Sequence, residues 1–243
     1  MRLAVSSRGV RQIHVLGGFV WHGAPKERRD LEWLDEVLET QGAQLLITGG
    51  NSEGYDALER DYPPNHDEHR SLTERIVWLP RGWRGATAAG TTVAGLGGAD
   101  SIDRPRRQPP VGGRGGSWRP QEQLTDADLA ALGTAHVDVL LAHDAPITTE
   151  LTRRLEPSRH RWTTAGLDYA NDGQQMFHRA VEQVRRQLVV SGHYHLHLDT
   201  TEMLCPATAE SFEIRSVILS GSGEPASAAV LDVGRQVVAM LEF

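Results

Sequence analysis

Cysteine is nearly absent from this sequence of 243 residues, which contains only Cys205. A single thiol cannot form an internal disulfide bond, so we expect a protein of a reducing compartment. No apolar run approaches the ~18 residues of a transmembrane helix, and the N-terminal text MRLAVSSRG lacks the apolar centre of a signal peptide. The sequence therefore predicts a cytoplasmic protein that has no membrane partner.

An excess of positive charge is missing as well. The formal net charge is −7, with 25 lysines and arginines against 32 aspartates and glutamates. Proteins that bind nucleic acids in general carry a basic face, so this charge balance disfavours that class. Hydrophobic residues make up 39% of the chain, which is sufficient for a packed core and argues against global disorder.

Short apolar runs alternate with segments of helical spacing along most of the chain. Strands are predicted at residues 12–17, 44–48, 75–79, 91–96, 137–142, 188–191, 213–219, 227–233 and 236–242, and helices at 31–38, 125–132 and 174–187. This alternation predicts an α/β fold, a layered sandwich that forms a single domain over residues 1–243. The segment at about 104–120 has four glycines, four prolines and five arginines, which predicts a long loop.

Polar side chains able to bind a metal follow three of the predicted strands. Asn51 comes after QLLITGG, His143 after VLLA, and His193 and His195 after LVVSG. Ligands of open α/β sheets lie beyond the carboxyl ends of the strands, so these residues are expected to meet at one edge. Neutral imidazole and amide groups suit zinc, manganese, iron or nickel rather than calcium. Each residue alone is more typical of a hydrogen-bonded loop, and only their shared placement favours a metal site.

The text around these residues resembles one protein family. The stretches GLGGADSIDR at 95–104, SWRPQE at 117–122 and LLAHDAP at 140–146 are similar to a bacterial subgroup of the calcineurin-like metallophosphoesterase superfamily. The loop GNSE at 50–53, His143 and the loop GHYH at 192–195 resemble the third, fourth and fifth metal-binding loops of that superfamily. The resemblance covers roughly residues 10–233. It implies the α-β-β-α sandwich of the metallophosphoesterases and hydrolysis of a phosphomonoester or phosphodiester.

The resemblance also implies a centre of two metal ions, about 3.5–4 Å apart, that bind the phosphate and a bridging hydroxide. The ions stabilise charge on the phosphoryl oxygens, so little side-chain chemistry is required. In the family's third loop, a histidine after the asparagine acts near the leaving oxygen.

Two departures from the family pattern weaken this expectation. The family's first loop, Asp-Xaa-His, is absent, because residues 1–17 contain no aspartate and their only histidine, His14, lies inside a predicted strand. Either the chain starts too late, and residues 2–9 are the end of the family's first helix, or MRLAV is the first strand and a deletion removed the loop. The fold is therefore expected to lack or alter the first strand–helix unit. In the second loop, Gly18 stands in place of the aspartate that bridges both metals.

A third departure affects catalysis directly. Ser52 stands where the family has its histidine, and serine cannot offer the same proton near neutral pH, so no catalytic side chain is predicted. One metal position would keep Asn51, His143 and His193, and the other only His195. Three protein ligands are sufficient for one zinc ion, so one ion is expected rather than two, and the loss of the carboxylates leaves open that none binds.

Other residues extend the candidate site. His22, close after the degenerate second loop, is an alternative ligand. Arg104 and Arg107, in the Gly/Pro/Arg-rich segment, are expected to bind a phosphate ester or nucleotide, although a solvated loop is an equally good interpretation. The sequence thus predicts a metal-dependent phosphoesterase of impaired activity. The alternative is a pseudoenzyme that keeps the scaffold as a ligand-binding or regulatory module.

Overall fold

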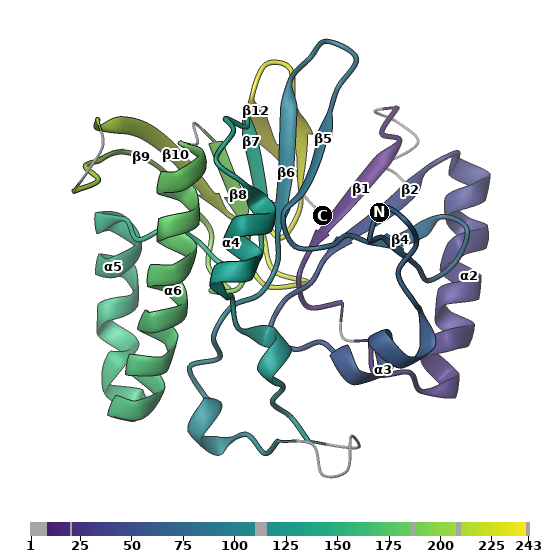
Figure 1. Ribbon diagram of the computed structural model, residues 1–243, viewed down its shortest axis with the longest axis horizontal. Helices are drawn as coiled ribbons and strands as arrows, with labels where there is room; N and C mark the ends of the chain where they lie inside the picture. Colours follow the sequence, from purple (N-terminus) through teal and green to yellow (C-terminus); the bar gives the residue numbers. More distant parts are fainter. Residues whose placement is uncertain (1–8, 20, 110–115, 186–187, 208–209, 242–243) are drawn as a thin grey trace.

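The structure is a computed structural model that describes residues 9–19, 21–109, 116–185, 188–207 and 210–241. It is an α/β fold in which two larger β-sheets lie next to each other (Figure 1), and a two-stranded hairpin forms a third, small sheet. Helix α2 lies at one side of the molecule and helices α5 and α6 lie at the opposite side. None of the helices in these ranges is both long and apolar enough to cross a membrane.

The first sheet has the strand order β1-β2-β4-β3. Its members are β1 (Gln12–Leu16), β2 (Gln44–Thr48), β4 (Ile76–Trp78) and β3 (Arg70–Ser71), of which the first three are parallel. Side chains alternate between the two faces of a strand. Leu45 and Ile47 accordingly pack in one cluster with Leu31 and Leu38 of helix α2 (Pro25–Gln41), whereas Leu46 lies in a different cluster. The short helix α3 (Tyr55–Asp61) contributes to the same helix-side cluster.

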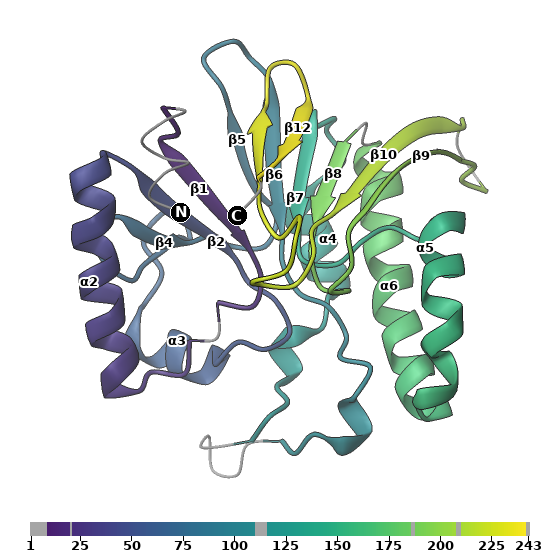
Figure 2. The same ribbon diagram turned by 180° about the vertical axis from the view of Figure 1, so that it is seen from behind.

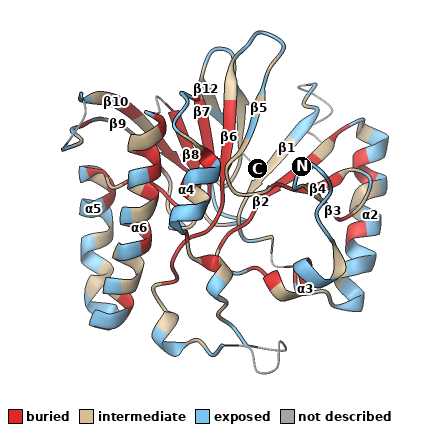
Figure 3. Cartoon of the chain, viewed as in Figure 1, coloured by how far each residue is buried: buried red, intermediate tan, exposed pale blue. Residues whose placement is uncertain are grey.

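The second sheet has the order β5-β6-β7-β8-β10-β9. Its members are β5 (Trp83–Ala86), β6 (Thr92–Leu96), β7 (Val139–Ala142), β8 (Leu188–Ser191), β10 (Phe212–Ile218) and β9 (Leu198–Leu204), and β6, β7, β8 and β10 are parallel. Strands β7 and β8 are buried along their whole length (Figure 3). Both faces of the sheet are therefore covered, as parallel sheets require.

Different elements cover the two faces of the second sheet. Leu140 of β7 packs with Phe177 of α6 (Thr164–Val184) and Leu129 of α4 (Asp126–Leu132), while α5 (Thr149–Leu155) lies against β9. The neighbouring Leu141 points the other way, into a cluster that includes Leu231. Leu231 belongs to the hairpin of β11 (Ala229–Asp232) and β12 (Val237–Met240). The hairpin can be followed in Figure 2, which shows the molecule from behind.

The two sheets meet through glycine backbone near the carboxyl ends of β2 and β6. The Gly98 N–H donates to the carbonyl oxygen of Gly49 over 2.9 Å. A Cβ atom on Gly97 would lie 2.5 Å from that same oxygen, which is closer than real Cβ atoms approach. Between the sheets, Trp83 of β5 packs against Leu46 and its ring lies 6.2 Å from that of His14. The approach of the sheets thus depends on the absence of side chains at one crossing point.

Most of the predicted elements are present, with shifted boundaries. All nine predicted strands overlap observed ones, and the runs at 44–48 and 188–191 agree residue for residue. Helix α2 extends the predicted segment 31–38 at both ends, and α6 starts at Thr164 instead of residue 174. The first half of α6 contains Gly166 and Gly173, where a Cβ would overlap the Ile102 carbonyl oxygen and the Asp100 side chain. Tertiary packing requires glycine at these two positions. Glycine lowers the helix propensity of the segment, so the sequence pattern did not predict the first half of α6.

Other predictions were incomplete. Strands β3, β5 and β9 and helices α3 and α5 were not predicted, because they are short, polar or at a sheet edge. The predicted loop at 104–120 holds a 3-10 turn at Arg104–Arg106, and its other described residues before Pro120 form no regular element. Residues 2–8, on which both explanations for the missing first loop depend, lie outside the described residues.

We predict that Gly97→Ala destabilises the protein, because the new methyl group must displace the Gly49 backbone at the crossing of the sheets. Overpacking of this kind costs about 1–3 kcal/mol. Urea denaturation gives the free energy of unfolding of the variant and of a control, Gly234→Ala, where the nearest atom to the new methyl group is 3.6 Å away. Equal stability of the two variants would contradict the tight crossing.

Candidate metal centre

Three loops at the carboxyl ends of strands bring the predicted ligands together. Asn51 follows β2, His143 follows β7 and His193 follows β8. The His143 Nε2 atom lies 3.1 Å from Asn51 Oδ1, and the ring centroids of His143 and His193 are 4.9 Å apart. We call Asn51, His143 and His193 the ligand cluster. The shared position of these residues at one edge of the sheets was predicted from the sequence.

The loop after β1 determines the protonation of His143. The His143 Nδ1 atom is 2.7 Å from the Leu16 carbonyl oxygen, which can only accept a hydrogen bond, so Nδ1 carries the proton. The approach requires glycine at the next position, because a Cβ on Gly17 would lie 2.0 Å from this nitrogen. Burial is the main cause that lowers the pKa of His143 to about 4; the charge of His195 acts in the same direction, and the hydrogen bond to Leu16 acts against both. At neutral pH, His143 Nε2 is therefore a bare lone pair.

The orientation of Asn51 follows from its other contact. The Asn51 Nδ2 group donates to Ser101 Oγ over 2.9 Å, and the amide oxygen consequently turns toward His143. Two acceptors, the Oδ1 atom and the Nε2 atom, then face each other across 3.1 Å with no proton between them. Two ligands bound at zinc–ligand distances to one tetrahedral or octahedral ion lie about 3.0–3.4 Å apart. The spacing of this pair fits a shared cation.

The GHYH loop is held in a strained conformation beside this pair. His193 and His195 have φ angles of 68° and 52°, in the left-handed region that residues with a side chain rarely adopt. Two hydrogen bonds anchor the loop to the one that follows β7. Tyr194 donates its hydroxyl proton to Asp144 over 2.8 Å, and the Gly192 N–H donates to the His143 carbonyl oxygen. Strain retained in this way is typical of functional sites.

His193 is neutral and His195 is peripheral. Burial lowers the pKa of His193 well below its usual value, and the nearby His143, His195 and Arg107 lower it further. His195 is exposed, and its ring packs beside Gly221. Within the part of the chain that the structure describes, no three His, Cys, Asp or Glu side chains form a group that could hold a metal. The ligand cluster contains only two such residues, and the amide of Asn51 is its third member.

The buried carboxylate in the loop after β2 ties two loops together. Glu53 Oε1 accepts hydrogen bonds from the backbone N–H groups of Phe19 and Gly50. It thereby joins the loop after β1 to the loop that carries Asn51. Tyr55 adds a hydrogen bond of 2.6 Å to the Gly50 carbonyl oxygen. The backbone of Gly50, directly before Asn51, is thus held at both its N–H and its carbonyl group.

A second buried carboxylate, Glu122, lies behind Asn51. It accepts a hydrogen bond from Ser101 Oγ over 2.9 Å and another from the Tyr169 hydroxyl over 3.1 Å. Burial raises the pKa of Glu122 to about 7. Neither Ser101 nor Glu122 was predicted as a site residue, although both lie in the stretches 95–104 and 117–122 that carry the family resemblance. A search for polar residues directly after strands could not find them, because they contact the site from loops.

Both predicted phosphate-binding arginines lie in the loop beyond β6. Arg107 donates to the backbone carbonyl oxygen of Asn51 over 3.0 Å and pairs with Asp103 over 2.7 Å. Arg104 lies with its guanidinium carbon 3.8 Å from the ring centroid of Trp118. Arg107 is thus directly beside the ligand cluster, whereas Arg104 packs against Trp118.

The positions that depart from the family pattern are open to solvent. Ser52 and Gly18 are exposed, and a Cβ on Gly18 would meet no atom within 4 Å. His22, the alternative ligand, lies beside Gly54 at the start of α3, and its backbone N–H donates to Glu27.

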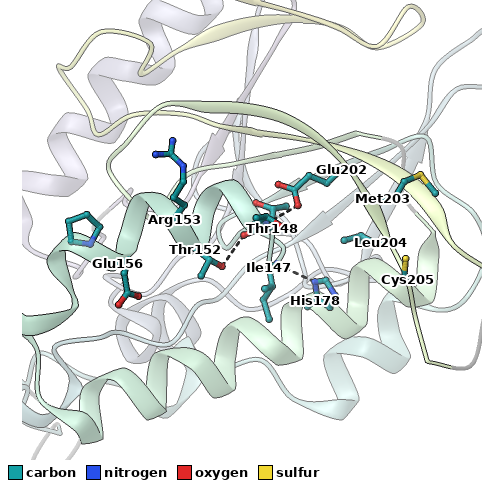
Figure 4. Close-up of a pocket in the computed structure, with 12 residues that line it drawn as sticks. Ile147, Thr148, Thr152, Arg153, Glu156, His178, Glu202, Met203, Leu204 and Cys205 are labelled. Carbon is teal, nitrogen blue, oxygen red and sulfur yellow. Dashed lines mark hydrogen bonds between the residues drawn. The ribbon is translucent and has the colours of Figure 1, made fainter.

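A separate cavity of about 910 Å³ lies between α5, α6 and β9 (Figure 4). Its wall includes His178, Glu202, Met203 and Cys205. His178 Nδ1 accepts the Ile147 N–H, and both carboxylate oxygens of Glu202 accept N–H groups at the start of α5. These polar groups therefore serve the packing of α5 and are not part of the ligand cluster.

No protein-family model matches this chain, and no curated protein sequence matches it. The resemblance to calcineurin-like metallophosphoesterases is therefore a hypothesis that rests on the sequence motifs.

We predict that His195→Gly is more stable than His195→Ala by about 1 kcal/mol, because glycine adopts a positive φ without steric strain. The side chain of His195 is exposed, so both variants lose little packing. Thermal and urea unfolding in EDTA compare the two proteins. A less stable glycine variant would show that the left-handed conformation at this position is not strained.

Proposed function

We propose that this chain is a metallophosphoesterase-like protein, with the α-β-β-α sandwich of that family, that retains one metal position and binds a phosphate ester there. The ion is a divalent transition metal, such as zinc or manganese, held by Asn51, His143 and His193. These are neutral N and O donors of the kind that such ions prefer. The phosphate ester is a small molecule or a nucleotide.

The facing acceptors of Asn51 and His143 are the observation that supports this proposal. Two partly buried lone pairs at 3.1 Å repel each other unless a cation or a proton lies between them. The low pKa of His143 disfavours the proton. An ion removes the repulsion, and the ring of the third ligand, His193, lies beside that of His143.

The residues of this chain have distinct tasks in such a site. A bound ion would polarise a phosphoryl oxygen and neutralise part of its charge. Arg107, fixed by Asp103 and by the Asn51 carbonyl oxygen, adds a permanent positive charge next to the ligand cluster. Ser52 cannot protonate a leaving oxygen near neutral pH, so the leaving group must depart without help from this loop. We therefore expect tight phosphate binding and slow hydrolysis.

A second candidate function is that of a pseudoenzyme that binds a ligand without turnover. The positions of Ser52 and Gly18 favour it, because each lacks the group on which the family's chemistry depends. Without a carboxylate at residue 18, the second ion has no bridge to the first. The scaffold would then serve as a metal-dependent binding module for phosphate compounds.

We predict that the chain, stripped with EDTA and titrated with Zn²⁺ or Mn²⁺, binds one ion. His143→Ala should weaken that binding by at least about 100-fold, because it removes a ligand held by a second hydrogen bond. Isothermal titration calorimetry and elemental analysis measure affinity and stoichiometry. The matched control is His66→Ala, since the His66 side chain is 93% exposed and lies outside the ligand cluster. Absence of binding by the wild-type chain would contradict the proposal.

We further predict that Gly18→Asp combined with Ser52→His increases hydrolysis of a generic phosphodiester. The space at residue 18 is open, and aspartate tolerates the φ of 69° there better than most residues. The increase should be at least about tenfold, within the usual contribution of a general acid. Initial rates with added Mn²⁺ are compared for the wild type and the double variant. If the wild type hydrolyses the phosphodiester rapidly and the double variant does so at the same rate, both the proposed slow hydrolysis and the pseudoenzyme alternative are contradicted.

A further inference from the structure

We infer that Glu122 is the positioning residue of this site. Through Ser101, it holds the Asn51 amide oxygen toward His143, and through Tyr169 it anchors the segment that carries Arg104. The orientation of the Asn51 amide does not depend on a bound metal, whereas its effect on metal affinity rests on the proposed function.

The direction of the hydrogen bonds carries the argument. A serine hydroxyl has a single proton, and Ser101 donates it to Glu122 Oε2 over 2.9 Å. The Ser101 oxygen can then only accept from Asn51, which must present its NH₂ group at a distance of 2.9 Å. The amide oxygen consequently points away from Ser101, to within 3.1 Å of His143 Nε2. Glu122, which is linked to Asn51 through Ser101, thus selects which side-chain atom of Asn51 faces His143.

The other carboxylate oxygen of Glu122 also accepts hydrogen bonds, so donation runs toward Glu122 from every neighbour described. Its Oε1 atom accepts from the Tyr169 hydroxyl over 3.1 Å and from the Ser101 N–H over 3.3 Å. Only 1% of Glu122 is exposed, and Arg107 Nη1 lies 3.7 Å from its Oε2 atom. The Ser101 N–H, the Ser101 hydroxyl and the Tyr169 hydroxyl all point at this carboxylate, and in its ionised form both oxygens accept and neither donates.

The same carboxylate also anchors the arginine-bearing loop. The Tyr169 hydroxyl, having donated to Glu122, accepts from Trp118 Nε1 over 2.9 Å. The ring of Trp118 in turn lies against the guanidinium of Arg104. One buried group therefore connects a metal ligand with the loop expected to bind phosphate.

A single substitution should reverse the direction of the hydrogen bonds that link Glu122, Ser101 and Asn51. In Glu122→Gln, the amide oxygen of the glutamine takes the Oε1 place, because an NH₂ group there would face the Ser101 N–H. The NH₂ group then donates to Ser101 Oγ, which must give its own proton to Asn51. The Asn51 amide turns over and donates to His143 Nε2. The two facing acceptors become an ordinary hydrogen bond, and the place for a cation is lost.

The orientation is tested without metal by NMR on protein labelled with ¹⁵N and ¹³C, in EDTA. In the wild type, the Asn51 side-chain NH₂ protons should show nuclear Overhauser effects to Ser101. In Glu122→Gln, they should show them to the ring protons of His143. Wild-type NH₂ protons close to His143 would overturn the inference whether or not the protein binds a metal.

Metal titration tests the consequence. Glu122→Gln should bind Zn²⁺ at least about 10–100-fold more weakly than the wild type, the usual effect of losing a group that orients a ligand. Ser101→Ala, which removes the relay without reversing it, should lie between the two. The matched control is Glu59→Gln, an exposed position on α3 with the same change of charge. Equal affinity of Glu122→Gln and wild type would overturn the inference, whereas failure of the wild type to bind would contradict only the proposed function.

Discussion

The close approach of the two sheets at glycine residues is the constraint on which the rest of the structure depends. Gly97 crosses the backbone of Gly49, and Gly17 leaves room for the His143 ring. These contacts bring the ends of β1, β2, β6 and β7 to one place, although the strands belong to two different sheets. A side chain at either position would separate the loops. The candidate metal centre therefore exists because backbone, without side chains, forms the junction.

The polarity of hydrogen bonds decides what that junction can bind. Leu16 contributes a carbonyl oxygen, which places the proton of His143 on Nδ1 and leaves Nε2 bare. Glu122, acting through Ser101, turns the oxygen of Asn51 in the same direction. Each of these partners is an acceptor that obliges its neighbour to donate. The result is a concentration of lone pairs in a buried place, which a cation satisfies better than any side chain nearby.

Strong local patterns made parts of the fold and of the site predictable. The run VLLA is apolar throughout and LVVS is apolar up to its final serine, which is typical of strands buried on both faces. VLLA ends directly before His143, and LVVS ends one residue before His193. Strand β9, with the text LDTTEML, carries no such pattern, because it lies at a sheet edge and depends on pairing with β10. Ser101 and Glu122 were missed for a related reason. Their role comes from contacts between loops 21 positions apart in the chain.

The sequence by itself determined the residue types at the strand ends. Neutral donor groups stand at Asn51, His143 and His193, and there is no carboxylate at Gly18 and no imidazole at Ser52. Only the tertiary structure decided the state of those ligands. A proton position and an amide orientation depend on which atoms lie within 3 Å, and folding alone brings Leu16 and Ser101 to that distance from His143 and Asn51.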